Sequence, residues 1–474
     1  NIGYVLSGIA PNIDINWLKA YKDPASGDYI NWNNNAYQVN PYWAINEQPN
    51  NSTQRRFNGF LLLKYELWPG LYIQGRTGTD YSRFNFTEFM QYSTPYYTTG
   101  GIVLLHRNLQ ETNSDLLVNY HQQWNKVSLE VNAGTNRMDY REEVRNATGR
   151  DMIIRGGKDY SNFKTQLGSH QLYRKRINSV YAAVTLGYND FIYLDLTGRN
   201  DWSSTLSAGH NAYFYPSASA SFVFSSLLPS GSILSFGKLR ASIAQTGTDA
   251  VAPYQTALTY AANPNIPSVG GYLIGGVATD KVPYENLKPS LTRSYETGLN
   301  LVFFNNRLQV DLTWYHSNTR NQILNAPISP TSGYTSAVIN SGNVSNQGLE
   351  IALGTRPVCK KDFTWQLHVN FAQNRNKIIS LSSLVSDYYT LAAARWGNAS
   401  IIAKAGAAYG MITGRKFLRD EQGRLVLDDN YLPQYTAADY NLGSTQYNWI
   451  GGITNSFTYR RWSSSILLDI RQGG

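Results

Sequence analysis

Residues 304–315 read FNNRLQVDLTWY, a tight polar turn that leads directly into an alternating run. Every second residue from Leu308 to Trp314 is apolar, and the residues between them are Gln309, Asp311 and Thr313. Successive side chains of a β-strand point to opposite faces, so the run predicts a strand with one apolar and one polar face. The turn before it predicts a hairpin to the preceding apolar run.

The same alternation recurs along the chain and predicts an antiparallel all-β protein with about fifteen strands. It is clear in residues 126–133, 192–197 and 363–371. Many runs reach about ten residues, which a tilted strand needs to cross a bilayer. A soluble antiparallel sheet with one buried face predicts the same alternation and is the alternative. The length of the runs and the Asn, Gln, Ser and Thr of the polar face favour a membrane barrel with a wet lumen.

Short and long connections alternate between these runs. Tight turns are predicted at residues 68–70, 124–126, 188–190, 304–307, 359–362 and 459–462. Long polar, aromatic and Gly/Asn-rich connections are predicted in the stretches 80–114, 139–176, 318–346 and 375–410. Bacterial outer-membrane barrels have short periplasmic turns and long extracellular loops. We therefore predict a large antiparallel transmembrane β-barrel.

The composition is compatible with this barrel. The 474 residues are 42% hydrophobic, the mean hydropathy is −0.37, and no run of about 18 apolar residues predicts a transmembrane helix. Aromatic residues flank the tight turns, which predicts an aromatic girdle at the periplasmic interface, although Tyr is also a good strand former. These residues are Trp68, Tyr72, Trp124, Tyr188, Tyr193, Tyr459 and Trp462.

No motif of an enzyme, a metal site or a nucleic-acid-binding protein is recognisable. The net charge of +9 is diffuse, and its longest basic run is Arg174-Lys175-Arg176. Basic residues toward strand ends are expected to meet outer-membrane lipid or solvent. The six His lack metalloprotease spacing, and no phosphate loop or G-x-S-x-G elbow is present. We predict no enzymatic activity, no catalytic residue, no cofactor and no metal; the single Cys359 is expected to be inert.

The acidic stretch from Asp420 to Asn430 has oxygen ligands and a glycine, but it lacks the register of a calcium loop. A solvated hairpin is predicted there, and a calcium-binding clip is the alternative.

Short motifs in a fixed order carry a resemblance to one family. They lie at residues 40–43 (NPYW), 179–204, 215–221 (YPSASAS), 238–247 (KLRASIAQTG), 286–298, 340–350 (NSGNVSNQGLE) and 451–457 (GGITNSF). Ala183 and Trp202 depart from the family pattern, which has Arg and Gly there. Each motif is weak, but the ordered set resembles the TonB-dependent outer-membrane transporters of the SusC/RagA type from Bacteroidetes. Glu296 and Glu350 of these motifs are expected on the lumen-facing side.

The resemblance implies a 22-stranded barrel in the outer membrane of a Gram-negative bacterium, of which residues 1–474 form an incomplete barrel domain. It implies a plug domain and final strands outside this sequence, a TonB complex that pulls on the plug, and a SusD-like surface lipoprotein that covers the mouth. It also implies active import of a bulky nutrient, an oligosaccharide first and an oligopeptide as the rival. A passive porin or adhesin barrel and a surface carbohydrate-binding β-protein are the alternatives.

Ligand contacts are expected in the loops, where aromatic rings and amides stack on sugars or hold peptide backbones. The candidates are Trp32, Tyr37, Tyr42, Trp43, Tyr388, Tyr389 and Trp396. The alternative is that the rings of long loops pack against one another.

Overall fold

The computed structural model describes residues 2–33, 35, 38–229, 231–249, 252–258, 260–262, 275–277, 281–283, 287–382, 385, 387–395 and 398–474. The chain divides into two compact units. Unit 1 comprises Asn1–Leu63, Gly75–Asp115 and Arg137–Arg176, and unit 2 comprises Lys64–Gln74, Leu116–Asn136 and Ile177–Gly474. Among the described residues, no helix is both long enough and apolar enough to span a membrane.

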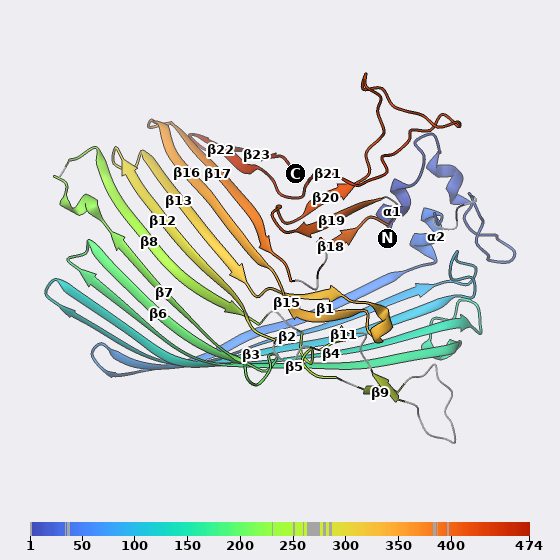
Figure 1. Ribbon diagram of the computed structural model, residues 1–474, viewed down its shortest axis with the longest axis horizontal. Helices are drawn as coiled ribbons and strands as arrows, with labels where there is room; N and C mark the ends of the chain where they lie inside the picture. The colour runs from blue at the N-terminus through green and yellow to red at the C-terminus, as the bar shows by residue number, and fades with distance from the viewer. Residues whose placement is uncertain are drawn as a thin grey trace. The chain divides into compact units, whose positions relative to one another are not determined.

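Fourteen strands form one sheet, and the prediction of a large antiparallel β-protein is confirmed. They are β1 (Asn50–Trp68), β2 (Leu71–Met90), β3 (Gly101–Trp124), β4 (Val127–Met152), β5 (Phe163–Tyr188), β6 (Ile192–Ser203), β7 (Ala212–Phe222), β8 (Leu234–Thr248), β12 (Ser290–Phe303), β13 (Leu308–Arg320), β16 (Asn343–Cys359), β17 (Phe363–Ser380), β22 (Trp449–Tyr459) and β23 (Trp462–Gln472). Each pairs with the next of these strands along the chain, from β1 to β23. The strands of unit 2 from β6 to β17 lie side by side in this order (Figure 1).

All six predicted tight turns join consecutive strands of the sheet. Asn125, Asn189, Asn305 and Arg460 occupy them with φ between 47° and 53°, the left-handed region that two-residue hairpin turns require. Asn tolerates this region because its short polar side chain bonds locally. The segment between β7 and β8 is longer and contains the 3-10 helix η3 (Phe224–Leu227).

The predicted long connections 80–114 and 139–176 are wrong in extent. Most of both stretches belongs to β2, β3, β4 and β5, which are 20, 24, 26 and 26 residues long. Within these two stretches, only residues 91–100 and 153–162 lie outside the strands. The strands extend because polar side chains pair across them, as Arg107 with Glu142 at 2.5 Å and Arg176 with Asp139 at 2.6 Å. Opposite charges across antiparallel strands stabilise a sheet that has no apolar face.

The other long connections carry small structures of their own. The two stretches 318–346 and 375–410 include parts of β13, β16 and β17 as well as these connections. The small strands are β9 (Tyr260–Ala262), β10 (Gly275–Val277), β11 (Lys281–Val282), β14 (Ile323–Pro327), β15 (Ser336–Asn340), β18 (Tyr388–Ala393), β19 (Ala399–Lys404), β20 (Met411–Gly414) and β21 (Tyr440–Ser444). The N-terminal segment adds α1 (Ile2–Ser7), η1 (Ile15–Lys19) and α2 (Pro41–Asn46), and the connections add η2 (Tyr160–Asn162) and η4 (Pro330–Ser332).

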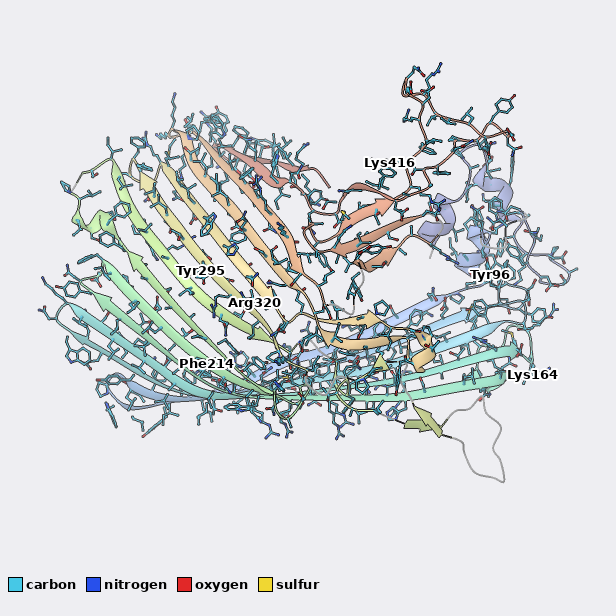
Figure 2. The ribbon with its side chains drawn as sticks, in the orientation of Figure 1. Tyr96, Lys164, Phe214, Tyr295, Arg320 and Lys416 are labelled. Carbon is cyan, nitrogen blue, oxygen red and sulfur yellow. The ribbon has the colours of Figure 1, made fainter. Side chains whose placement is uncertain are left out.

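The sheet of unit 2 has the two faces that the alternation predicts. Leu312 pairs with Leu299 and with Ile351, whereas its neighbour Asp311 pairs with Asn300 on the opposite face. Large side chains of the apolar face are exposed, among them Trp314, Leu239 and the labelled Phe214 and Tyr295 (Figure 2). Clusters of buried apolar residues that the structure describes lie instead at strand ends and in the connections. A soluble sheet buries its apolar face, so this arrangement favours a sheet whose apolar face meets lipid.

Candidate functional site

Trp43 is the centre of an aromatic layer in unit 1. Helix α2 begins at Pro41, whose fixed φ suits the first helical position, and its first turn directs Trp43 inward. The Trp43 side chain is 0% exposed, and its Nε1 donates to Thr94 Oγ1 at 2.9 Å. The rings of Tyr21 and Tyr29 meet the indole edge to face, with centroids 6.3 and 5.3 Å away. The structure therefore gives Trp43 a packing role, as the self-packing alternative predicts.

Asn40 connects this layer to the segments around it. Its side chain is 0% exposed, and its Oδ1 accepts the Tyr42 N–H at 2.9 Å as the N-cap of α2. Its Nδ2 donates to the Leu18 carbonyl oxygen at 2.9 Å, and its backbone N–H donates to the Tyr29 hydroxyl at 2.9 Å. Together with the places of Pro41 and Trp43 in α2, these bonds make the Asn, Pro and Trp of the NPYW motif structural residues.

The other predicted ligand contacts of the N-terminal segment lie on the surface of the layer. The half-buried Tyr42 ring stacks on Tyr21 with an interplanar angle of 16°. The half-buried Trp32 donates from Nε1 to the Gln38 carbonyl oxygen at 2.9 Å. Both rings keep part of their surface accessible, and their role in ligand binding stays a prediction. Tyr37 lies outside the described residues.

The second predicted group lies on β18 in unit 2. Tyr388 is exposed and lies opposite Lys404 of the neighbouring strand β19. Tyr389 points to the other face of β18 and packs against the cluster of Val344, Ile378 and Ala403. Tyr388 is thus the accessible member of the pair, and its ligand contact stays a prediction. Trp396 lies outside the part of the chain that the structure describes.

The polar face of unit 2 contains an ion-pair network around Arg240, which sequence analysis missed. Arg240 Nη1 donates to Asn300 Oδ1 at 2.7 Å, and its Nη2 donates to Thr313 Oγ1 at 2.5 Å. The guanidinium also lies 3.4 Å from Asp311 Oδ1 and 3.5 Å from Glu296 Oε1. Asn300 donates in turn to Asp311. One arginine of β8 thereby organises polar side chains of β12 and β13, the next two strands of the sheet.

This network borders a groove of about 730 Å³ on the polar face. Lys238, Arg240 and Asp311 line it together with His368 and Asn370. The groove is open, and these charged and amide side chains suit a wall that faces water or a hydrated partner. The predicted polar-face position of Glu296 agrees with this arrangement. The alternation in the sequence predicts which residues lie on the polar face. It does not predict which of them lie opposite each other on neighbouring strands, and the contacts of the network depend on that register.

A second polar cluster fixes the ends of β6 and β7. Asp201 is buried and accepts from Arg199 Nε at 2.7 Å and from the Tyr215 hydroxyl at 2.6 Å. The Arg199 Nη2 donates to Ser179 Oγ at 2.7 Å. Buried carboxylates are stable only when paired in this way, so these residues of the 179–204 motif are structural. Thr205 donates to the buried Asp249 at 3.0 Å and so ties the next connection to this end.

The acidic stretch 420–430 lies in a ribbon, residues 415–439, that extends beyond β20 and β21 (Figure 1). Three short pieces of this ribbon, around Leu418, Val426 and Gln434, are bridged to one another. Bridges join Phe417 to Tyr435 and Arg419 to Leu425. The Arg424 and Gln422 amides donate to Asp420 Oδ1 at 2.9 and 3.0 Å, and these bonds, the Arg424 amide first, lower the pKa of the half-buried Asp420 carboxyl. The predicted hairpin is confirmed. Across the described residues no group of three His, Cys, Asp or Glu is arranged to hold a metal ion.

Residues 5–466 match the family described as "TonB dependent receptor-like, beta-barrel". The chain is 24% identical to TonB-dependent receptor P3 of Formosa agariphila, over 72% of this chain and 35% of that protein. It is 27% identical to TonB-dependent receptor SusC of Bacteroides thetaiotaomicron, over 37% of this chain and 20% of SusC.

A solved structure titled "Structure of the RagAB peptide transporter" has the same fold. It superimposes with a TM-score of 0.77 and 19% identity, over 91% of this chain and 49% of that chain. At this identity the likeness shows the fold alone. The chain spans about a third or less of the length of the curated relatives it matches.

Proposed function

We infer that this chain, which belongs to the TonB-dependent receptor-like β-barrel family, is the barrel domain of a SusC/RagA-type transporter in the bacterial outer membrane. The observation that supports this most directly is the two-faced sheet. Its apolar face exposes Leu239 and Trp314, as lipid contact requires, and its polar face carries the Arg240 network. A wall with these faces separates lipid from a hydrated interior.

We propose that residues 1–474 act as one barrel domain together with parts of the protein beyond this chain. Those parts include a plug domain, and TonB pulls on this plug to open a path through the barrel. A separate SusD-like surface lipoprotein covers the extracellular mouth. The transported molecule is moved without chemical change, so no catalytic residue is required. The family match and the similarity to SusC support this proposal.

The proposed substrate is an oligosaccharide, and the accessible rings of Trp32 and Tyr42 in unit 1 and of Tyr388 in unit 2 are separate candidate contacts beside the amides of the loops. Aromatic faces and amide groups suit the apolar faces and hydroxyls of sugar rings. An oligopeptide is the second candidate, favoured by the fold shared with the RagAB peptide transporter. The loop residues Tyr37, Tyr389 and Trp396 remain in the proposed set as predictions, whereas the burial of Trp43 argues against direct contact.

The proposal is tested by purifying the full-length protein from detergent-solubilised outer membranes and identifying its companions by mass spectrometry. We expect a SusD-like lipoprotein and a bound glycan. A bound peptide would assign the second substrate class. A barrel that purifies alone and empty, from cells in which deletion of TonB leaves uptake unchanged, would instead support a passive porin.

The ligand residues are tested separately with Tyr388→Ala and a matched Tyr409→Ala control, since Tyr409 is an equally exposed tyrosine of unit 2. If Tyr388 holds the ligand, its loss weakens binding of the co-purified ligand about tenfold or more, in the range of an interface hot spot. Equal affinity of the two variants would remove Tyr388 from the binding set.

A further inference from the structure

A basic patch lies on one face of β4 and β5 in unit 1. We define it as Arg137, Arg141, Arg145, Arg174, Arg176 and His170, together with the carboxylates Asp139 and Glu143. Asp139 is held between Arg137 Nε at 2.7 Å and Arg176 Nε at 2.6 Å. Glu143 accepts from Arg145 at 2.6 Å and from His170 at 3.0 Å. Five arginines against two carboxylates leave the patch clearly positive, and all five are exposed.

The alternation of each strand places this patch on the same face as its apolar residues. In β5 the even-numbered positions that include Val180, Val184 and Leu186 continue to Arg176 and Arg174. In β4 the odd-numbered positions that include Val127 and Val131 continue to Arg137 and beyond. Lys175 and Arg107 belong to the opposite face; Arg107 pairs there with Glu142. The patch therefore follows directly after the proposed lipid-facing residues of the same two strands.

The distance along the strands gives the depth of the patch in a membrane. A strand rises about 3.4 Å per residue and is tilted about 40° in a barrel, so each residue gains about 2.5 Å in height. The apolar band of an outer-membrane barrel is about 25 Å tall, or about ten residues. In β5 we count from Tyr188, which flanks a tight turn, and ten positions lead to Asn178. Arg176 and Arg174 are the next two positions on the same face. From Val127 the same count reaches Arg137. Both strands thus place arginine at the height of the outer-leaflet headgroups.

We propose that this patch binds the phosphorylated sugar headgroup of an anionic glycolipid in the outer leaflet, such as lipid A. Arginine matches phosphate because its planar guanidinium donates two parallel hydrogen bonds. Arg137 and Arg176 lie at the depth of the lipid phosphates, and Arg141, Arg174 and Arg145, which are farther along their strands from the turn, lie higher, beside the attached sugars. Asp139 and Glu143 hold the guanidinium groups apart and in position in the absence of lipid. The inference rests on the proposed outer-membrane location.

The test uses the full-length protein in detergent, with bisphosphorylated lipid A as the probe and native mass spectrometry as the readout. Arg174→Gln/Arg176→Gln removes two positive charges from the patch. Lys175→Gln/Arg107→Gln removes two from the opposite face of the same region and is the matched control. We expect the first variant to bind lipid A about tenfold or more weakly, because it loses two of the five guanidinium groups that can pair with the lipid phosphates, and the control to bind as the parent does.

Two further probes identify the chemistry. Dephosphorylated lipid A with the same acyl chains is expected to bind as weakly to the parent as lipid A binds to the patch variant. Inorganic phosphate that competes at equal concentration would assign the patch to soluble anions and overturn the lipid proposal. Equal binding of lipid A to the parent and both variants would overturn it as well.

Membrane fractionation and uptake are scored on the same variants. A patch variant that loses lipid binding, still reaches the outer membrane and still transports its substrate supports this inference and leaves the proposed function intact. A protein that never fractionates with the outer membrane contradicts the proposed function itself. Folding of each variant is checked by the heat-modifiable electrophoretic mobility of the barrel, so a misfolded variant is recognised and replaced by the single Arg174→Gln.

Discussion

The aromatic layer of residues 15–47 and the ribbon of residues 415–439 both carry aromatic rings on largely polar segments, but these rings are placed in opposite ways. In the layer Trp43 is 0% exposed, its indole N–H donates to Thr94, and its helix α2 is capped by Asn40. In the ribbon Tyr431 is 83% exposed, and the ring pair that the structure describes there is Phe417 with Tyr435. The difference teaches that aromatic content alone does not mark a ligand site. Rings pack where capped turns and buried polar groups bring segments together, and they stay accessible where only a ribbon supports them.

The largest expected effect tests the packed side of this comparison. Trp43→Ala removes a fully buried indole and leaves a cavity, so we expect the free energy of local unfolding of residues 15–47 to fall by about 3–5 kcal/mol. Native-state hydrogen exchange measures it. Trp17→Ala is the control, because Trp17 lies in the same segment and is 70% exposed; we expect a change within about 0.5 kcal/mol. A similar loss of local stability in the Trp43→Ala and Trp17→Ala variants would mean that the burial of Trp43 does not stabilise the layer.

A second prediction concerns the polar link within the layer. Asn40→Ala removes the cap of α2 and leaves the Leu18 carbonyl oxygen without its donor. Loss of a cap costs about 1 kcal/mol and a buried unsatisfied group about 1–3 kcal/mol, so we expect a loss of about 2–4 kcal/mol in the same exchange measurement. Asn46→Ala, at an exposed position of the same helix, is expected to leave protection nearly unchanged. An unchanged Asn40 variant would show that water replaces both bonds.

The strands were predictable because their pattern is local. Alternation identified the two faces, and the Asn-containing turns fixed the hairpins, as at Asn125 and Asn189. The extent of β2 to β5 was not predictable, since their upper parts lack an apolar face and are held by pairs such as Arg107 with Glu142. Such pairs depend on register, which is a property of two strands together.

The candidate site was predictable only as a set of residue types. Sequence composition selected Trp43 and Tyr42 together, because both are loop aromatics beside asparagine. The structure separates them: one ring is at the centre of the layer and the other is on its surface. Burial follows from partners far away in the sequence, such as Thr94 for Trp43. The Arg240 network escaped notice for the same reason.

The third prediction addresses the ribbon. Phe417→Ala removes a stacked ring pair whose centroids are 5.1 Å apart. Such a pair contributes about 0.5–1.5 kcal/mol, so we expect exchange of the ribbon amides to become up to about tenfold faster. Tyr431→Ala is the control, because this exposed ring has little contact surface to lose. A large effect at Tyr431 would show that the ribbon is covered by a partner in the membrane, which would break the contrast with the aromatic layer.

The smallest expected effect is a pH dependence of the turn at Asp420. Its amide donors lower the pKa of this carboxyl below the usual 3.8. The carboxylate therefore contributes its full stabilisation of the turn above pH 3.8, and this contribution is lost as the pH falls through the lower folded pKa. Protection of the Gln422 and Arg424 amides, corrected for intrinsic exchange, should decrease across that acid range. Asp420→Asn should remove this pH dependence, while Asp429→Asn should retain it. Because Asp420 belongs to none of the buried apolar clusters that the structure describes, the aromatic layer should keep its protection throughout this acid range. Parallel losses of protection in both regions would contradict their independence.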